Sequence, residues 1–531
     1  MELRLLAPRF RSWMGLLLLA GQALLITAGA EAAELRIGLM NLARSADPHL
    51  GANRADYLLH DQIYEGLAGV DAAFRPVPRL AERWEQTADG AWLFHLRRGV
   101  RFQNGQPFTA RDVLYSFCRV GKVGLEPRAL AARLAGIIAV EAPDPFTIRI
   151  RHEMRVAIFP SDMASVPIVA APADLNITFT PGGCAGDRWG DSDHYADPGF
   201  GTGPFRLARF AADEMVVERN RDYWGSPAGW DHVRLIHLTE KERVTAMVEG
   251  RIDILDNPSL ESLPFFARRP DLVLVEGPSS GVTYLQSNQR AADGPDGPNR
   301  FRDRRVRRAL LLAIPGRLLA DRIVPGFGNA TGQMAMKDTD AHVPDIPDDE
   351  HDLAEARRLL AEAGFAGGFD TTLMVTPMQS KVGDAIAHFL AMVGVRAKVQ
   401  VEPMDRYIER LRTGEFELFY GGWIYNPANM PASLLALLGR GVEGTGRGAH
   451  NYGGYCNADI DRQLVTALGE ADAGRRNRLL QDAARALHDD VAWIPVMHAE
   501  GRWLVRAGIR LEPRLDRMLL AREITAEPAT R

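Results

Sequence analysis

A pair of glycines followed by two aromatic residues and an amide is the segment of this sequence best suited to holding a small ligand. Gly421-Gly422 leave a predicted strand at 417–419, and Trp423, Tyr425 and Asn426 come directly after them. Glycine allows close backbone approach, aromatic rings provide flat apolar walls, and an amide both donates and accepts hydrogen bonds. We interpret 419–427 as a binding loop with Gly422, Trp423, Ile424, Tyr425 and Asn426 as candidate contacts. The alternative is that Trp423 and Tyr425 are core aromatics at a strand end.

Further candidate contacts come from other parts of the chain. The loop at 40–47, after a predicted strand at 35–39, supplies Asn41, Ala43 and Arg44. The glycine-rich run at 441–454 supplies Tyr452 and is either a lid over a cleft or a surface loop. Tyr284 is a further candidate contact. Such residues suit a ligand cleft between domains in which backbone edges are free to pair with an extended ligand.

Two common catalytic signatures are absent from the sequence. It contains no HExxH and no GxxxxGK[ST], which removes the sequence basis for a zinc protease or a nucleoside triphosphatase. Its 13 histidines are scattered, and the acid–histidine neighbours at 152–153 and 488–490 are typical of surface or capping positions. We therefore expect a binding protein with no catalytic residues, no metal site and no cofactor.

The N-terminal residues 1–33 are predicted to be a cleavable signal peptide. Arg4, Arg9 and Arg11 precede an apolar stretch at 13–28, and Ala30-Glu31-Ala32 offers a cleavage site. An uncleaved anchor is the alternative, which the short apolar stretch disfavours. No cysteine lies near the cleavage point, so a lipid anchor is not supported. The expected location is the periplasm.

Composition and charge narrow the class of protein. The chain has 531 residues, 46% of them hydrophobic and 25% charged, as in a soluble protein of two or three domains. A formal charge of −5 argues against a nucleic-acid partner. The basic run at 302–308 is interpreted as a solvated helix face opposite apolar positions such as Val306 and Leu310.

Three cysteines allow at most one disulfide. Cys118 lies on the apolar side of a predicted helix and is interpreted as a core residue. An oxidising compartment permits a bridge between Cys184 and Cys456, although no feature of the sequence places them within bonding distance.

The segment at 80–119 predicts a β-rich unit that leads into a helix. Residues 92–97 alternate as in a strand, a second strand starts at Val100, and Asn104-Gly105 is a type I′ turn signal. Thr109 is the predicted N-cap of the helix, with Asp112 three residues further on. From Pro278 onward, strands at 371–375 and 396–401 alternate with helices, which is typical of a mostly parallel α/β domain.

A series of short motifs follows one another along the chain. They are Asp47-Pro48-His49, Tyr64-Glu65-Gly66-Leu67, the segments 80–85 and 89–113, Gly201–Phe205, Tyr223-Trp224-Gly225, and the segments 301–313, 362–365 and 455–461. In this order they resemble one family, the large periplasmic solute-binding receptors of bacterial ABC importers, of the oligopeptide, dipeptide and nickel-binding type (family 5). The resemblance extends over about 35–505.

The resemblance implies a fold of the type II periplasmic-binding-protein class: two hinged α/β lobes with a small inserted α+β domain. Applied to this chain, domain I comprises 34–61, 197–277 and 496–531, domain II comprises 62–196, and domain III comprises 278–495. The hinged lobes are expected to close on a ligand and deliver it to a membrane permease.

The resemblance also places the 419–427 segment where family members pair with peptide backbone. Peptide-binding members carry an aspartate three residues after the tryptophan, which neutralises the ligand ammonium, whereas this chain has Asn426. A neutral amide forms a weaker bond to a cation than a carboxylate does. Acylated peptides, sugars, opine-like compounds and metal chelates therefore become alternatives to free peptides. The implied partners are the ligand and the permease subunits, with contact to the membrane only through the permease, and the protein is expected to be a monomer. A ligand-presenting sensor or a chaperone on the same scaffold is the alternative function.

Overall fold

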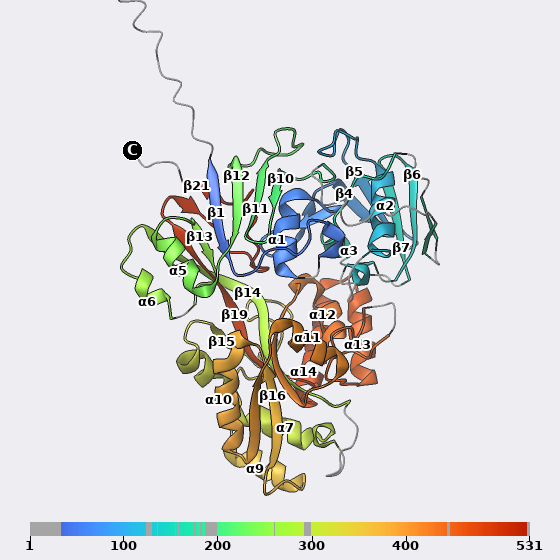
Figure 1. Ribbon diagram of the computed structural model, residues 1–531. Helices are drawn as coiled ribbons and strands as arrows, with labels where there is room; N and C mark the ends of the chain where they lie inside the picture. The colour runs from blue at the N-terminus through green and yellow to red at the C-terminus, as the bar shows by residue number, and fades with distance from the viewer. Residues whose placement is uncertain are drawn as a thin grey trace, which may run out of the picture.

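Two long antiparallel strands, β14 (Leu272–Ser287) and β19 (Ile494–Arg506), run between the two halves of the structure (Figure 1). The computed structural model describes residues 33–51, 53–123, 130–134, 136–153, 156, 159–173, 177–180, 183–185, 199–259, 261–290, 299–442 and 446–527. Within these residues, eleven strands form one sheet in the order β10-β11-β12-β1-β13-β19-β14-β18-β16-β17, with β15 paired to β19. The predicted signal peptide lies outside the described residues.

The first lobe contains the half of this sheet that begins at β10. Its strands are β1 (Glu34–Leu39), β10 (Phe205–Phe210), β11 (Glu214–Arg219), β12 (His232–His237) and β13 (Ile254–Asp256). Its helices are η1 (Pro48–Leu50), α1 (Arg54–Ile63), α5 (Glu240–Val248) and α6 (Leu263–Phe266). β1 is parallel to β12 and β13, so the carboxyl ends of these three strands lie together. The C-terminal segment, with the short strands β20 (Ile509–Arg510) and β21 (Thr525–Ala526), packs on this lobe through Leu519 and Ile524.

The second lobe contains the other half of the sheet. Its strands are β15 (Gly328–Ala330), β16 (Phe369–Val375), β17 (Val395–Val401) and β18 (Leu418–Ile424). Its helices are η3 (Arg300–Arg302), α7 (Arg304–Ala313), α8 (Gly316–Leu318), η4 (Leu319–Ile323), α9 (Leu353–Glu362), η5 (Pro377–Gln379), α10 (Ser380–Ala391), α11 (Met404–Thr413), η6 (Pro427–Asn429), α12 (Met430–Leu438), α13 (Ala458–Gly469) and α14 (Ala473–Asp489). β16, β17 and β18 are parallel, as the alternating pattern of this region predicts. The boundaries predicted near 278 and 495 fall within β14 and β19.

A small domain with its own four-stranded antiparallel sheet lies beside the first lobe (Figure 1). Its sheet has the order β4 (Ala81–Gln86), β5 (Trp92–Leu96), β7 (Thr147–His152) and β6 (Ile137–Asp144), accompanied by β2 (Ala68–Val70), β3 (Pro76–Pro78), β8 (Thr178–Thr180), β9 (Gly183–Ala185), α2 (Ala110–Val120), η2 (Ala131–Arg133) and α3 (Phe159–Asp162). Thr109 is the N-cap of α2 as predicted, and its N–H donates to Asp112 Oδ2 at 2.8 Å. The second predicted strand, from Val100, is wrong: only an isolated bridge joins Arg101 to Pro107. The turn is not type I′ either, because Gly105 has a positive φ and Asn104 does not.

Three of the sequence motifs meet at one buried carboxylate, that of Glu65. Its oxygens accept hydrogen bonds from Thr202 Oγ1 at 3.0 Å, Tyr223 Oη at 2.9 Å and Trp224 Nε1 at 2.8 Å. Burial raises the pKa of Glu65, and the bonds from Trp224 and Tyr223 oppose that shift. These motifs therefore fix the junction between the small domain and the first lobe.

The disulfide differs from the predicted candidate. Cys118 in α2 is bonded to Cys184 in β9, while Cys456 is free and exposed. Cys118 is buried as predicted, but it is a bonded residue of the small domain. The spacing of the three cysteines along the sequence does not indicate which two the fold brings together.

The basic run at 302–308 is only partly a solvated face. Arg307 is buried, and its guanidinium donates to the backbone oxygens of Val491 at 2.9 Å and Asp490 at 2.7 Å. Arg302, Arg304 and Arg305 are exposed, as predicted. Arg307 thus binds the C-terminal end of α14 to α7.

Candidate ligand-binding site between the lobes

The main feature of the site is a backbone edge of β18 that is free of strand pairing within the described part of the chain. β18 pairs with β14 along its whole length, but β16 pairs with β18 only at Leu418 and Phe419. Tyr425 N donates to Ser280 O in the direction of β14, so the backbone groups of Gly422 and Ile424, which alternate with it, point to the opposite edge. Both residues are exposed. An extended ligand can therefore add to the sheet at this edge.

This finding changes the interpretation of the glycine pair. The sequence places Gly421-Gly422 at the start of a loop after Phe419, whereas the strand continues to Ile424. The long strand β14 supplies the pairing partners that hold two glycines in extended conformation, with Gly421 opposite Tyr284 and Gly422 opposite Thr283. The candidate contacts are therefore carried by a strand, which positions them more rigidly than a loop does.

An aromatic cluster lies beside this edge. The ring of Trp423 is 4.7 Å from that of His450, which is 5.9 Å from the ring of Tyr452, and Tyr452 contacts Phe419. The buried indole Nε1 of Trp423 has no hydrogen-bond partner within the described part of the chain. Burial lowers the pKa of His450 to about 4, with the positive charges of Arg133 and Arg412 acting in the same direction. The imidazole is therefore neutral at pH 7.

The second lobe contacts the small domain next to this cluster. Asn429 Nδ2 donates to Asp162 Oδ1 at 3.0 Å, and Arg133 Nη1 is 3.5 Å from the same oxygen. Burial raises the pKa of Asp162, while the charge of Arg133 opposes the increase. Arg133 is partly exposed, so it can present a guanidinium to an acidic group between the lobes.

The remaining predicted contacts differ in exposure. Tyr284 and Tyr425 are buried, with exposed fractions of 4% and 1%, and Tyr284 packs between Phe419 and Trp493. Asn426 is half-buried at the end of β18. These residues support the strand and the aromatic cluster from behind, and Trp423, Gly422 and Ile424 form the accessible part.

The loop at 40–47 belongs to the first lobe. Asn41 and Arg44 are exposed and Ala43 is buried. Arg44 N donates to Asp56 Oδ1 at 2.9 Å, and its guanidinium lies 3.6 Å from the other oxygen of Asp56. Asp56 thus fixes the loop to α1, at the carboxyl end of β1, where ligands of open α/β sheets commonly bind.

Sequence reasoning missed His450, Arg133, Asp162 and Asn429. His450 lies within the glycine-rich run that supplied Tyr452, so that run carried a signal for it. Arg133 and Asp162 are about 300 residues from Asn429 and His450 in the chain, and nothing in their local sequence indicates that the fold brings them together.

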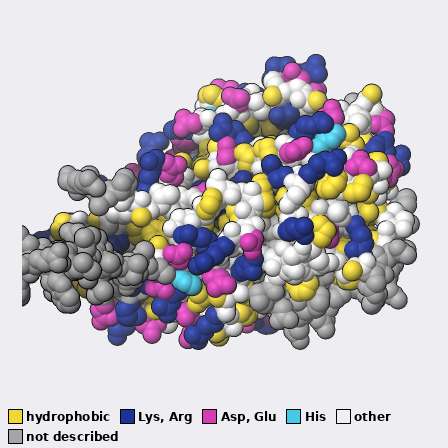
Figure 2. All heavy atoms as spheres, turned by 90° about the horizontal axis from the view of Figure 1, so that it is seen from above, with side chains coloured by type: hydrophobic (Ala, Val, Ile, Leu, Met, Phe, Trp, Pro, Cys, Tyr) yellow, Lys and Arg dark blue, Asp and Glu magenta, His cyan; other side chains and the backbone are white. Residues whose placement is uncertain are grey.

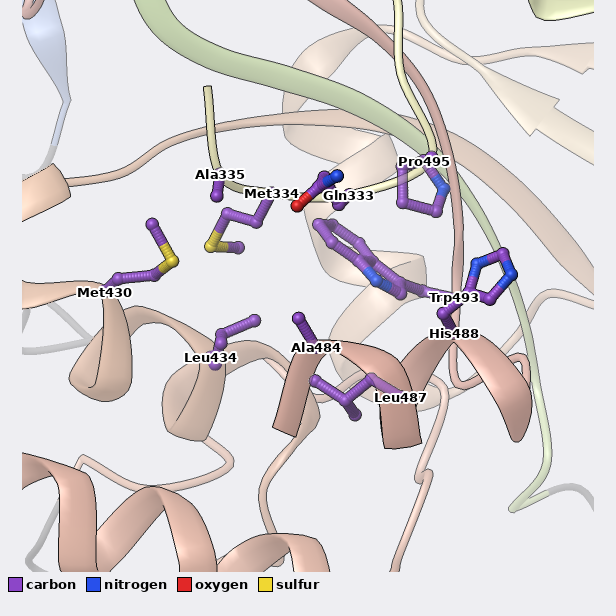
Figure 3. Close-up of a pocket in the computed structure, with 11 residues that line it drawn as sticks. Gln333, Met334, Ala335, Met430, Leu434, Ala484, Leu487, His488, Trp493 and Pro495 are labelled. Atoms are coloured by element: carbon purple, nitrogen blue, oxygen red, sulfur yellow. The ribbon is translucent and has the colours of Figure 1, made fainter. Parts of the chain in front are cut away.

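A small cavity lies inside the second lobe, among β19, α12, α14 and the 332–335 loop (Figure 3). The thioethers of Met334 and Met430 point into it, and Trp493 forms one wall. The space open to the centre of a water molecule is about 20 Å³, room for one water. It is too small for the ligand.

Among the described residues, no group of three or more His, Cys, Asp and Glu side chains could hold a metal ion. None of the helices in that part of the chain combines the length and apolar character that a membrane crossing requires. Figure 2 shows basic and acidic side chains interspersed over the face that it presents, with no extended region of one sign.

Two lobes joined by paired strands, with an exposed strand edge and aromatic side chains near the contact of the second lobe with the small domain, define a periplasmic-binding-protein type of structure. Residues 75–444 match the middle region of the bacterial extracellular solute-binding proteins, family 5, and the chain belongs to this family. It is a family of non-enzymatic proteins that serve ABC transporters.

Individual relatives bind different solutes, according to their names. Heme-binding protein A of Haemophilus influenzae is 25% identical over 451 residues, which cover 80% of this chain and 79% of the relative. The glutathione-binding protein GsiB of Salmonella choleraesuis is 27% identical over 470 residues, 85% of this chain and 86% of that protein. The periplasmic binding protein DppA of Helicobacter pylori, solved with the peptide STSA, superimposes with a TM-score of 0.78 at 23% identity and covers 94% of this chain and 99% of its own.

Proposed function

We propose that this protein is a periplasmic receptor that captures a peptide-like or other small polar solute between its lobes and delivers it to the permease of an ABC importer. The observation that carries the proposal is the free edge of β18 at Gly422 and Ile424, next to the half-buried Trp423. A ligand with an extended amide backbone can exchange hydrogen bonds with this edge. Closure of the lobes requires contacts that the ligand makes better in the closed state than in the open state.

The charged groups near the edge favour a solute with an acidic group and no free ammonium. Arg133 is a partly exposed cation where the small domain contacts the second lobe, and Asn426 occupies the position where family peptide receptors carry an aspartate. His450 is neutral and hydrogen-bonds Tyr452 Oη at 3.2 Å. An acylated peptide has this pattern of charges, and so does an opine-like derivative whose nitrogen is part of an amide.

Identification of the solute comes first among the tests. Mass spectrometry of compounds that co-purify with the periplasmic protein should find one solute, and titration calorimetry should reproduce its binding to protein freed of ligand by unfolding and refolding. Turnover of the solute by the pure protein would contradict a receptor function.

The edge itself is tested with a matched pair of variants. Gly422→Pro removes an N–H that points away from β14, so the ladder between β14 and β18 stays intact, and proline is tolerated at such edges. Gly422→Ala is the control, because an added Cβ would meet no atom closer than 3.8 Å, Val282 O. We expect Gly422→Pro to bind the solute at least about tenfold more weakly, which corresponds to one lost hydrogen bond, and Gly422→Ala to bind within a few-fold of the wild type. Equal affinities of the two variants would exclude this edge.

A further inference from the structure

A cluster of buried and half-buried arginines lies at the point where the first lobe meets the paired strands β14 and β19. The hinge cluster, as we name it, consists of Arg54, Arg243, Asp256, Glu276, Arg502 and Arg517. Asp256 ends β13, Arg502 lies in β19 opposite Glu276 of β14, and Arg517 belongs to the C-terminal segment. None of these residues takes part in the site on β18.

Direct contacts hold the cluster together. Arg54 binds both oxygens of Asp256, at 2.8 and 3.0 Å, and its Nε donates to Arg517 O at 3.2 Å. Arg243 Nη1 donates to Asp256 O at 2.6 Å. Asn257, the next residue, donates its N–H to Arg502 O at 3.0 Å, and Arg502 Nε donates to Glu276 Oε1 at 2.9 Å.

The cluster contains more positive than negative charge. The guanidinium groups of Arg54, Arg502 and Arg517 face the carboxylates of Asp256 and Glu276, which leaves a formal excess of one positive charge among these five residues. The Glu276 side chain is 48% exposed, so solvent weakens its contribution, whereas the Arg502 side chain is only 4% exposed. Burial of like charges without compensation is unfavourable, and an anion would remove that cost.

Arg502 and Arg517 each carry a buried donor that is left unsatisfied by the described residues. Arg502 Nη2 and Arg517 Nε form no hydrogen bond with them. Arg502 as a residue is 97% buried, since its exposed fraction is 3%. A buried guanidinium nitrogen without an acceptor is rare in native proteins and calls for an explanation such as a bound ion.

The electrostatics and the backbone conformation of the cluster also support a bound anion. Burial lowers the pKa of Arg517. The charge of Asp256 opposes this shift, whereas the charges of Arg54 and Arg502 add to it, so Arg502 and Arg517 repel each other. Asn257 and Arg517 both have left-handed backbone conformations, with φ of 50° and 58°. Such conformations in residues other than glycine are costly and concentrate at functional sites.

We propose that the hinge cluster binds a small oxyanion, a carboxylate, sulfate or phosphate group, through Arg502 Nη2 and Arg517 Nε. Gly326 of the second lobe lies against Arg502, because a Cβ at Gly326 would be 3.4 Å from Arg502 Nη2. The anion would therefore bind where the two lobes meet and neutralise the excess charge of the hinge. Its source is either a free inorganic ion or the acidic end of the captured solute.

Thermal unfolding of solute-free protein in sodium sulfate and in sodium chloride, at equal ionic strength, tests the site. Arg517→Gln is the main variant, since Arg517 is partly exposed and its substitution should not prevent folding. Arg268→Gln is the control, an exposed arginine of the same lobe. At a hundredfold excess of sulfate over its Kd, we expect the Tm of the wild type and of Arg268→Gln to rise by about 2–4 °C more than that of Arg517→Gln.

A second measurement does not depend on any variant. Wild-type crystals soaked in selenate should give an anomalous peak within hydrogen-bond distance of Arg502 Nη2 and Arg517 Nε. Equal responses of the wild type and Arg517→Gln to sulfate, together with no peak, would overturn the proposal.

Measurements of solute binding distinguish the two possible sources of the anion. If it is the acidic end of the solute, sulfate competes with the solute and Arg517→Gln binds the solute at least tenfold more weakly. If it is a free ion, Arg517→Gln binds the solute as the wild type does. A protein that responds to sulfate but binds no solute would retain this site and contradict the proposed receptor function instead.

Discussion

Arg119 binds both carboxylate oxygens of Asp47, at 2.8 and 2.5 Å, and neither side chain is exposed. Asp47 follows β1 of the first lobe, and Arg119 lies in the last turn of α2 in the small domain. His49 extends the contact: its Nδ1 lies 2.9 Å from Arg119 Nη1, and its Nε2 lies 2.9 Å from Pro167 O. The Asp-Pro-His motif therefore joins the small domain to the first lobe through a buried ion pair.

Removal of one member of this pair should strongly destabilise the protein. Arg119→Met leaves the carboxylate of Asp47 buried without its cation, which costs about 3–5 kcal/mol. Urea denaturation followed by circular dichroism measures the free energy of unfolding. Arg83→Met is the control, because Arg83 and its partner Glu85 are exposed, and we expect a change below about 1 kcal/mol. Similar values for the two variants would show that the buried pair contributes little.

His49 should make the protein sensitive to acid. Burial lowers the pKa of His49 to about 4, and the charge of Arg119 acts in the same direction. The unfolded chain binds a proton near pH 6.5 and the folded protein does not, so stability falls as the pH decreases from about 6.5 to 4. Between pH 7.5 and 4.5 this group should remove about 2–3 kcal/mol of unfolding free energy. His49→Gln should reduce that loss, and equally steep pH profiles for the wild type and the variant would contradict the assignment.

The disulfide predicts how many cysteine thiols react in the native protein and how much its removal lowers the free energy of unfolding. Native protein should react with one equivalent of a thiol reagent, at the exposed Cys456, and unfolded, reduced protein with three. The bond between Cys118 and Cys184 closes a loop with a sequence separation of 66, so its removal should cost about 2–4 kcal/mol. Cys184→Ala with Cys118→Ala tests this, with Cys456→Ala as the control. Three reactive thiols in the native protein would contradict this pairing.

Local patterns predicted the regular elements well, because they depend on residues close in sequence. The strands at 371–375 and 396–401 and the cap at Thr109 all formed where the periodicity and capping signals indicated. The ordered motifs correctly indicated the family and its fold. The limits of the domains remain a prediction, since β14 and β19 cross between the lobes without interruption.

Features that depend on contacts between distant parts of the chain could not be predicted from the sequence, for a physical reason. The extent of β18 depends on pairing with β14, about 140 residues earlier, and this pairing overrides the usual tendency of Gly421-Gly422 to end a strand. The contact of Asp162 with Asn429, and the pairing of Cys118 with Cys184, likewise depend on how whole elements pack. Sequence identified Trp423 and Tyr425 together, but only the structure separates an accessible ring from a buried one.

This separation gives opposite expectations for two neighbouring aromatic residues. Trp423 is half-buried beside the free edge, and its Nε1 has no hydrogen-bond partner among the described residues. Trp423→Ala should therefore weaken solute binding at least about tenfold with little loss of stability. Tyr425 is 1% exposed within the core cluster, so Tyr425→Ala should lower the unfolding free energy by about 3–5 kcal/mol. Tyr425→Phe keeps the ring and should lose much less. Calorimetric titration with the co-purified solute and urea denaturation measure the two effects. Wild-type affinity in folded Trp423→Ala would place the solute elsewhere and leave Trp423 with a structural role only.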